Sequence, residues 1–192
     1  TRPGDMGYDI VHINIHKTFS TPHGGGGPGS GPIGVSKELA KFLPVPEVAY
    51  DKKRDRFYLD YDKVESVGKI RSFYGNIAVL LRAYAYILCM GGEGLEEAAE
   101  ISVLNANYLV RKLSEIRGLE LPYARGRPRK HECVFSVKSM YKDTGVRAMD
   151  VAKRLLDYGL HSPTTYFPLI VDEALMIEPT ESMEKEELDR FV

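Results

Sequence analysis

A lysine, three histidines and a run of glycines lie close together near the start of the chain and could form one chemical site. Lys17 directly follows an alternating apolar stretch, residues 9–16, and precedes a segment with six glycines in the eight residues 24–31. Glycine loses more conformational freedom on folding than any other residue, so such a run suits positive-φ turns, close approach of a ligand, or a nest of N–H groups that holds an anion. A flexible linker is the alternative. The flanking strand patterns and three nearby prolines favour a shaped functional loop.

Lys17 has the clearest chemical potential of these residues. At the end of a buried strand, its amine must reach solvent, find a counter-charge or lose its proton. Burial disfavours the charged form of an amine, and a neutral amine attacks carbonyl carbons. A lysine of this kind can hold a cofactor aldehyde as a Schiff base. The alternative is a lysine whose stem lies along the strand end while its charged head stays in water.

The histidines at positions 12, 16 and 23 could indicate a metal site. In a helix, His12 and His16 would share a face and could bind one zinc ion. In a strand, four residues span about 13 Å, which is too far for one ion. The alternation favours the strand, so zinc is not expected, and His16 is better placed to stack on or hydrogen-bond to an aromatic cofactor. A histidine bound by loop backbone is an equally good explanation.

Two further motifs are weaker candidates. Residues 29–34 match the G-x-G-x-x-G pattern, but they lie deep in a loop, whereas a dinucleotide fingerprint follows a strand directly and opens a helix. The P-loop pattern is absent from the sequence. His161 and Thr164 belong to a proline-fixed His-Ser-Pro-Thr segment after a helix pattern, which is a reasonable place for a ligand contact. A plain connection between a helix and a strand explains that segment equally well.

Composition and charge are those of an ordinary globular protein. Of 192 residues, 43% are hydrophobic and 28% charged, which excludes disordered and membrane proteins as the class. A net charge of −1 gives the whole chain no electrostatic attraction for nucleic acid, and we interpret the basic run 125–131 as a solvated loop. The two cysteines fit a reducing compartment. The sequence has no continuous apolar run of about 18 residues, the length of a membrane span, so a cytoplasmic location is expected.

Hydrophobic periodicity predicts a mixed α/β chain that positions these residues. The predicted strands are residues 9–16, 32–36, 119–121, 132–139, 165–171 and 174–178. The predicted helices are residues 36–42, 76–90, 95–117, 146–158 and one that opens at 179–182, and a hairpin or surface loop is expected to turn at 52–56. This order predicts the end of one α/β domain followed by a small α/β domain. Because the first residues read as a turn and the last as helix interior, we expect a piece of a longer polypeptide.

Several of these segments together resemble one enzyme family. Residues 16–19 (HKTF), 22–29 (PHGGGGPG) and 31–35 (GPIGV) are similar to the cofactor-lysine segment of glycine decarboxylase, the pyridoxal-phosphate-dependent P-protein of the glycine cleavage system. The resemblance extends through residues 104–108, 150–155, 157–164, 177–182 and 187–191, and so covers nearly the whole chain. It implies the C-terminal part of the second subunit of a two-subunit form.

The resemblance implies the α/β fold of type I pyridoxal-phosphate-dependent transferases. Residues 1–70 would be the end of the large cofactor-binding domain, and residues 71–192 the linking helices and small C-terminal α/β domain. Lys17 is implied to carry pyridoxal 5′-phosphate as a Schiff base, with His16 and Thr18 beside the cofactor. The residues that we expect along the substrate site or the lipoyl channel are His23, Gly24, Gly25, Gly26, Gly27, His161 and Thr164.

The implied reaction is decarboxylation of glycine with transfer of the aminomethyl group to the lipoyl arm of the H-protein. The implied partners are P-protein subunit 1, the lipoylated H-protein and glycine, in a hetero-oligomer such as a heterotetramer, with neither nucleic acid nor membrane. Such enzymes place an acidic residue on the pyridine nitrogen from a strand well upstream of the lysine, and only sixteen residues precede Lys17 here. We therefore expect the chain alone to be inactive.

Two other functions stay open at this point. The first is another type I pyridoxal-phosphate enzyme, such as an aminotransferase or a desulfurase; an aminotransferase would use a small-domain arginine for the substrate carboxylate, and none is obviously placed for it. The second is a non-catalytic assembly subunit with the same fold. The lysine and its intact glycine loop argue against that second function.

Overall fold

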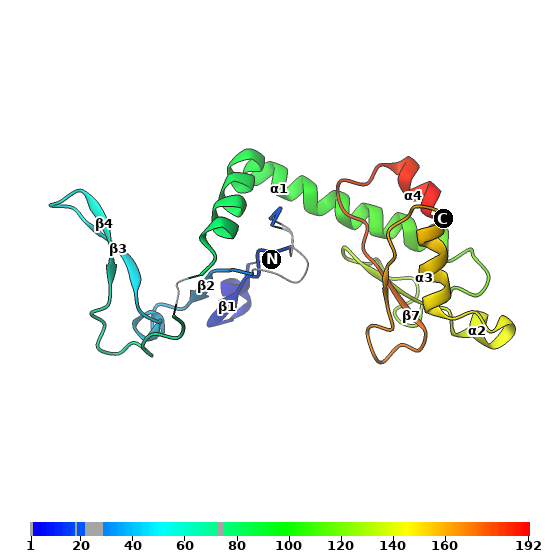
Figure 1. Cartoon of the computed structure of the whole chain (residues 1–192), viewed down its shortest axis with the longest axis horizontal. Helices are drawn as coiled ribbons and strands as arrows, with labels where there is room; N and C mark the ends of the chain where they lie inside the picture. Colours follow the sequence, from blue (N-terminus) through cyan, green and yellow to red (C-terminus); the bar gives the residue numbers. More distant parts are fainter. Residues whose placement is uncertain (1, 18, 22–28, 73–74) are drawn as a thin grey trace. The chain divides into compact units, whose positions relative to one another are not determined.

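The computed structural model describes residues 2–17, 19–21, 29–72 and 75–192, and the chain forms two compact units, Thr1–Gly91 and Gly92–Val192 (Figure 1). The domain boundary that the sequence predicts at residue 70 refers to the domains of a larger enzyme and stays a prediction.

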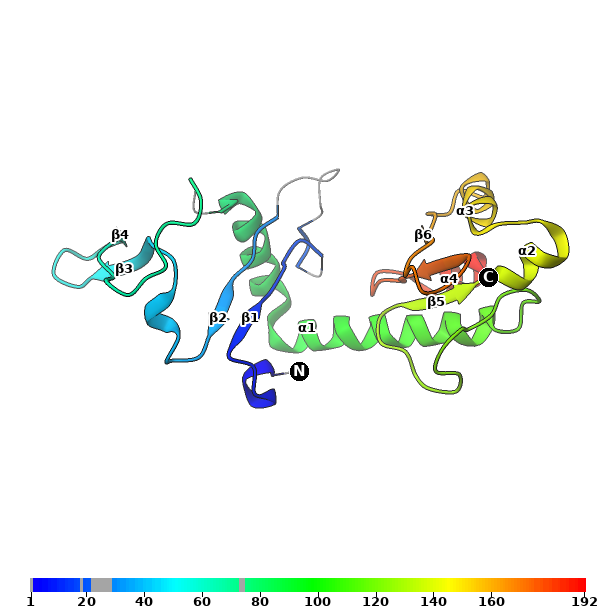
Figure 2. The same ribbon diagram turned by 90° about the horizontal axis from the view of Figure 1, so that it is seen from below.

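The first unit begins with a short 3-10 helix, η1 (Pro3–Met6), and a two-stranded antiparallel ladder (Figure 2). Strand β1 (Ile10–His12) pairs with β2 (Ile33–Val35), so both predicted strands form. The first is much shorter than expected, because regular strand geometry ends at His12. A second short 3-10 helix, η2 (Ala40–Phe42), occupies the end of the predicted helix 36–42.

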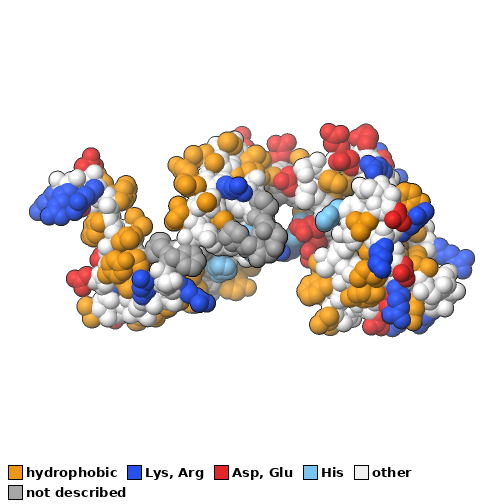
Figure 3. Space-filling model, viewed as in Figure 1, with side chains coloured by type: hydrophobic (Ala, Val, Ile, Leu, Met, Phe, Trp, Pro, Cys, Tyr) orange, Lys and Arg blue, Asp and Glu red, His pale blue; other side chains and the backbone are white. Residues whose placement is uncertain are grey.

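A hairpin follows, with its turn where the sequence predicts one. Strand β3 (Glu47–Asp51) pairs with β4 (Arg56–Asp60) in an antiparallel register that sets Val48 opposite Leu59 and Tyr50 opposite Phe57. Cross-strand partners lie on the same face of a ribbon, so these four side chains form one apolar face. All four are exposed, and hydrophobic side chains gather along this hairpin, with Lys and Arg side chains at its turn (Figure 3).

The long helix α1 (Ile77–Leu113) starts in the first unit and ends in the second. At Gly91 the backbone has φ 63° and ψ −175°, which are not helical values. The sequence therefore predicts the interruption correctly, although helical hydrogen bonding resumes at once on the far side. The predicted second helix extends only to Leu113 instead of residue 117. By length and composition alone, α1 is also long and apolar enough to cross a membrane.

The second unit is built on a three-stranded antiparallel sheet in the order β5 (Cys133–Ser136), β7 (Ala174–Ile177), β6 (Thr164–Thr165). The predicted strand 119–121 is reduced to a single bridge between Glu120 and Ser136. The predicted strand 165–171 is also too long, because only its first residue lies within β6. An apolar run extends as strand only where a neighbouring strand offers backbone partners, which the sequence pattern does not encode.

Three helices complete this unit: α2 (Lys138–Thr144), α3 (Ala148–Asp157) and α4 (Lys185–Phe191). Helices α3 and α4 are predicted, although α4 begins at Lys185 and not at 179–182. The predicted strand 132–139 is too long, because β5 ends at Ser136 and α2, which the sequence pattern misses, begins at Lys138. The end of α1 packs on the sheet and on α4 through a core that contains Leu109, Leu113, Cys133, Phe135, Ile177 and Leu188. Val137, Ala148 and Leu175 form a second core cluster with partly buried side chains.

Candidate functional site

Ile15 is the structural centre of the lysine segment. Its side chain is only 5% exposed, and both its backbone N–H and its carbonyl oxygen form hydrogen bonds. The Ile15 N–H donates to the carbonyl oxygen of Ser30 at 3.3 Å, and the buried hydroxyl of Thr21 donates to the carbonyl oxygen of Ile15. Thr21 precedes the glycine-rich loop and Ser30 lies at its end. Both ends of that loop are thus attached to one residue, two positions before Lys17.

The end of the loop comes unusually close to the β1 extension. The Ile13 N–H donates to the carbonyl oxygen of Pro32 at 3.1 Å, which continues the β1–β2 pairing beyond His12. Between these contacts, a Cβ on Gly31 would overlap the carbonyl oxygen of Ile13 and lie 3.3 Å from Cε1 of His12. Only a residue without a side chain fits there, so the glycine at position 31 is required by packing.

Helix α1 supplies a third support for this segment. Val79 and Ala83, on the first turns of α1, form a buried cluster with Ile15, and Phe19 packs against it. The Asn76 side-chain amide, just before the helix, donates to the carbonyl oxygen of Gly29 at 2.7 Å. The backbone around Lys17 is therefore held by a strand ladder, by hydrogen bonds at both loop ends and by a helix.

Lys17 and His16 follow the buried Ile15, and both side chains are more exposed than that residue. Lys17 is exposed and His16 is half-buried, with its Nδ1 3.5 Å from the position of a Cβ on Gly29. Of the three outcomes that the sequence leaves open for Lys17, the described structure shows the one in which the side chain reaches solvent. Lys17 forms no ion pair with any described residue.

The described structure does not test the other predicted site residues. Thr18, His23 and Gly24–Gly27 lie outside the described residues, so their roles stay predictions. His161 and Thr164 belong to the second unit, where both are exposed and Thr164 pairs with Met176 as the first residue of β6. Their place along a lipoyl channel stays a prediction too.

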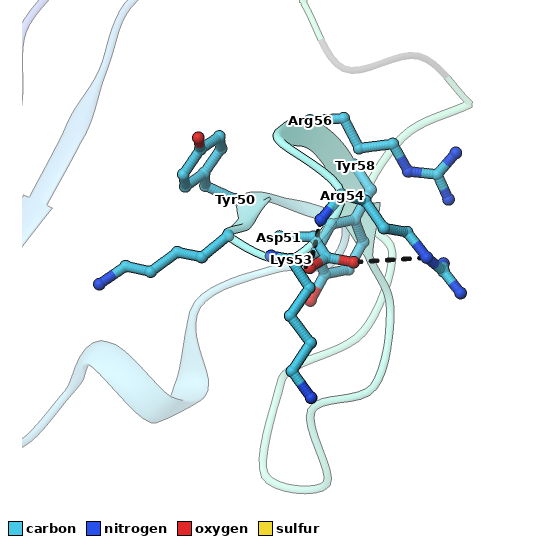
Figure 4. Close-up of a pocket in the computed structure, with 7 residues that line it drawn as sticks. Tyr50, Asp51, Lys53, Arg54, Arg56 and Tyr58 are labelled. Atoms are coloured by element: carbon cyan, nitrogen blue, oxygen red, sulfur yellow. Dashed lines mark hydrogen bonds and ion pairs between the residues drawn. The ribbon is translucent and has the colours of Figure 1, made fainter.

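A metal cluster or a surface cavity would be an alternative to the Lys17 segment as a site. Within the described ranges, no three His, Cys, Asp or Glu side chains lie close enough together to hold a metal ion. A cavity of about 460 Å³ lies at the hairpin turn, where Arg54 reaches toward Asp51 (Figure 4). Its lining residues, Tyr50, Asp51, Lys52, Lys53, Arg54, Arg56 and Tyr58, all come from the hairpin, none from the Lys17 segment.

Sequence reasoning missed three residues that shape the lysine segment: Thr21, Gly31 and Asn76. The sequence signal for Gly31 is its place in the G-x-G-x-x-G pattern. That pattern indicates a dinucleotide site less well than it indicates a close backbone contact. Asn76 precedes an apolar helix pattern, and this position usually indicates a helix cap. Its contact with a residue 47 positions away could not be read from local pattern.

The family model and the curated relatives that match this chain are glycine dehydrogenases. Residues 98–192 match the model of the glycine dehydrogenase C-terminal domain. Over its whole length the chain is 64% identical to the probable glycine dehydrogenase (decarboxylating) subunit 2 of Pyrococcus horikoshii, 65% to that of Thermococcus gammatolerans and 59% to that of Thermosipho africanus. In each case it spans 38% of the relative's length.

Solved structures share the fold at lower identity. A glycine decarboxylase (P-protein) of the glycine cleavage system in inhibitor-bound form superposes with a TM-score of 0.78 at 22% identity, covering 100% of this chain and 43% of that one. The apo cysteine desulfurase of Thermococcus onnurineus gives a TM-score of 0.65 at 15% identity, covering 98% of this chain and 46% of that one. The expected fold class, that of type I pyridoxal-phosphate-dependent enzymes, is thereby confirmed.

Proposed function

This chain belongs to the glycine dehydrogenase (decarboxylating) subunit 2 family, and from this premise we propose that it supplies the cofactor-lysine segment of an enzyme that decarboxylates glycine. The aminomethyl group would pass to the lipoyl arm of the H-protein. The observation that carries the proposal is an exposed lysine amine on a backbone held from three sides. Because the chain spans 38% of its relatives' length, the activity is assigned to the complete enzyme.

The residues of the lysine segment fit the aldehyde end of pyridoxal phosphate. Attachment needs a primary amine that is accessible and not locked in an ion pair, and Lys17 meets both needs among the described residues. His16 directly precedes it and is half-buried, so its ring is held near the attachment point. When bound, the cofactor supplies an electron sink for the electrons that the departing carboxylate leaves behind.

The protein's own part in this reaction is attachment and orientation. Lys17 would hold the cofactor, and the hydrogen bonds of Ile15 would fix where the lysine backbone lies. Thr18, next in sequence, is proposed as a further cofactor contact. We assign His23, the four glycines Gly24–Gly27, His161 and Thr164 to the substrate site or lipoyl approach, following the family resemblance.

Partners follow from the relatives' names and from the reaction. The relatives are called subunit 2, so we propose a hetero-oligomer with a subunit 1. Transfer of the aminomethyl group requires a lipoylated H-protein and glycine as substrate. Both cysteines, Cys89 and Cys133, are free, which accords with the cytoplasmic location that we propose.

The complete two-subunit enzyme tests the role of Lys17. After borohydride reduction, peptide mapping should find the cofactor on Lys17, and Lys17→Ala should lose both the label and glycine decarboxylation. Lys37→Ala, at an exposed lysine of the same unit, is the matched control and should keep both. Label on another lysine, with Lys17→Ala still active, would overturn the assignment.

A second candidate function follows from the likeness to a cysteine desulfurase. Exchange of labelled carbon dioxide into glycine, measured with lipoylated H-protein, separates the two, because a desulfurase does not catalyse it. Release of sulfide from cysteine without this exchange would favour the second candidate.

Gly25→Ala with Gly26→Ala should slow transfer to lipoate more than glycine binding if this loop lines the lipoyl approach.

A further inference from the structure

We propose that Gly75 and Asn76 are positioning residues that hold the end of the glycine-rich loop against the Lys17 segment. The inference rests on the proposed function, because it takes Lys17 as the lysine that holds the cofactor. It adds a residue pair far away in sequence, at the start of α1, to the parts that set the position of that lysine.

The Asn76 side chain makes the decisive contact. Its Nδ2 donates to the carbonyl oxygen of Gly29 at 2.7 Å. The next residue, Ser30, accepts the Ile15 N–H through its own carbonyl oxygen at 3.3 Å. Asn76 is therefore connected to the residue two positions before Lys17 through adjacent loop residues, with one hydrogen bond at each end.

This side chain is not needed to start the helix. The backbone carbonyl oxygen of Asn76 accepts the N–H groups of Val79 at 3.0 Å and Leu80 at 3.2 Å, which form the first turn of α1. The side-chain oxygen of an asparagine before a helix usually accepts the N–H of the second or third helical residue, here Ala78 or Val79. Here the amide donates across to the loop instead, so the side chain serves the loop.

Gly75 lets the chain approach the loop closely enough for this bond. Its φ of +123° is a value that residues with a side chain rarely adopt, and a Cβ there would lie 3.3 Å from the Ser30 hydroxyl oxygen. Both the backbone angle and the space at position 75 therefore favour glycine. The pair Gly75–Asn76 meets the same two loop residues, Gly29 and Ser30.

The hydrogen bond from Asn76 adds direction to an attachment that is otherwise apolar. Val79 and Ala83 pack on Ile15, which fixes α1 to the strand side of the segment. Apolar packing alone is not directional, whereas the hydrogen bond from Asn76 specifies where the loop end lies. Loss of that bond should free Gly29 and Ser30 while leaving the helix in place, and Lys17 should then occupy several positions.

The sharpest variant is Asn76→Asp in the full-length subunit within its two-subunit complex. Aspartate is nearly the same size and suits a helix N-terminus, but its carboxylate cannot donate and would face the carbonyl oxygen of Gly29. We expect hydrogen exchange of the Ile15 amide to speed up about fivefold to tenfold, the equivalent of one hydrogen bond. Attachment of pyridoxal phosphate to Lys17 should slow by a similar factor, with kcat reduced and the KM for glycine little changed.

Two further variants separate a local effect at Asn76 from a general loss of stability. Asn107→Asp is the matched control, because Asn107 also donates from α1 to a loop carbonyl oxygen, that of Arg129 at 2.8 Å, but in the second unit. It should leave both Ile15 exchange and cofactor attachment unchanged. If Asn76→Asp does not fold, Gly75→Ala tests the same contact through the backbone and should also speed Ile15 exchange.

The outcomes separate this inference from the proposed function. Unchanged Ile15 exchange in the Asn76 variant would overturn the contact, and faster exchange with normal cofactor attachment would overturn the positioning role. If the unmodified enzyme carries no cofactor on Lys17, the proposed function fails; Ile15 exchange, measured without cofactor, still decides whether Asn76 holds the loop.

Discussion

At the scale of single residues, the lysine segment depends on small side chains in crowded places. Lys17 itself is exposed, whereas the backbone just before it is fixed by close contacts of Ile13 and Ile15 with the loop end. An exposed amine can react specifically when the backbone that carries it has a fixed position. The hydrogen bonds of Ile13 and Ile15 fix that backbone. Residues that touch no substrate can therefore control the site.

Gly31→Ala tests this dependence. The added Cβ would overlap the Ile13 carbonyl oxygen, so the backbone must shift, at a cost of about 1–3 kcal/mol in the free energy of unfolding. Gly34→Ala is a neighbouring control, since a Cβ there has no described atom within 4 Å. Thermal unfolding of both variants, together with cofactor labelling of Lys17, measures the difference. Equal stability of the two would contradict the close approach.

Cys133 gives a prediction on pH. Burial raises the pKa of its thiol from 9.0 to about 12, so between these values the folded protein keeps a proton that the unfolded chain loses. The free energy of unfolding should therefore fall as pH rises above 9, by about 1.4 kcal/mol per pH unit from this group. Urea unfolding at pH 8 and 10 should show a smaller fall for Cys133→Ala than for the unmodified protein. An identical fall would show that the thiol is not buried.

At the scale of elements, α1 packs against the lysine segment at one end and against the core of the second unit at the other, and its helical geometry is interrupted between them. Its first turns hold the lysine segment, its last turns build the core of the second unit, and Gly91 separates the two parts. The values at Gly91, φ 63° and ψ −175°, belong to a region that is essentially reserved for glycine.

Two adjacent alanine substitutions should therefore act in opposite directions. Gly91→Ala must strain the backbone and should cost about 1–3 kcal/mol in stability. Gly92→Ala lies in open space without a positive φ, and should be neutral or stabilising by up to about 1 kcal/mol, because alanine favours helices over glycine. Denaturant unfolding of the two variants provides the comparison. A stabilising Gly91→Ala would mean that the helix is continuous there.

At the scale of the whole molecule, the chain exposes more surface than its mass explains. Two separate globular bodies of half its mass each would together expose about 11,000 Å². The chain of 21.6 kDa exposes 14000 Å², and exposed apolar side chains gather on the hairpin and on the first part of α1 (Figure 3). Surface of this kind is normally covered by further protein.

We therefore expect the apolar side chains to be covered in the complete enzyme. Leu81 and Leu88 on α1 and Phe57 on the hairpin are 61%, 64% and 72% exposed here. Radical footprinting of the assembled two-subunit enzyme should label them weakly, and labelling should rise when urea dissociates the subunits or unfolds the chain. Strong labelling of all three in the intact enzyme would contradict this expectation.

The sequence by itself determined the features that local chemistry controls. Alternation and turn residues were enough to predict β2, a turn at 52–56, the break at Gly91, and the helices α3 and α4. The lysine followed by a glycine-rich loop stood out by composition, because no packed helix or strand needs such residues. The family resemblance rested on the same local strings and is confirmed by the relatives.

Only the tertiary structure decided where strands end and which residues support the lysine. The lengths of β1 and β6 depend on neighbouring strands, and α2 follows β5 without a signal that separates them. The contact of Asn76 with Gly29 joins residues 47 positions apart, and the need for glycine at position 31 arises from the carbonyl oxygen of Ile13. Long-range backbone pairing and steric contact exist only once the chain has folded, and a linear pattern of residue types does not contain them.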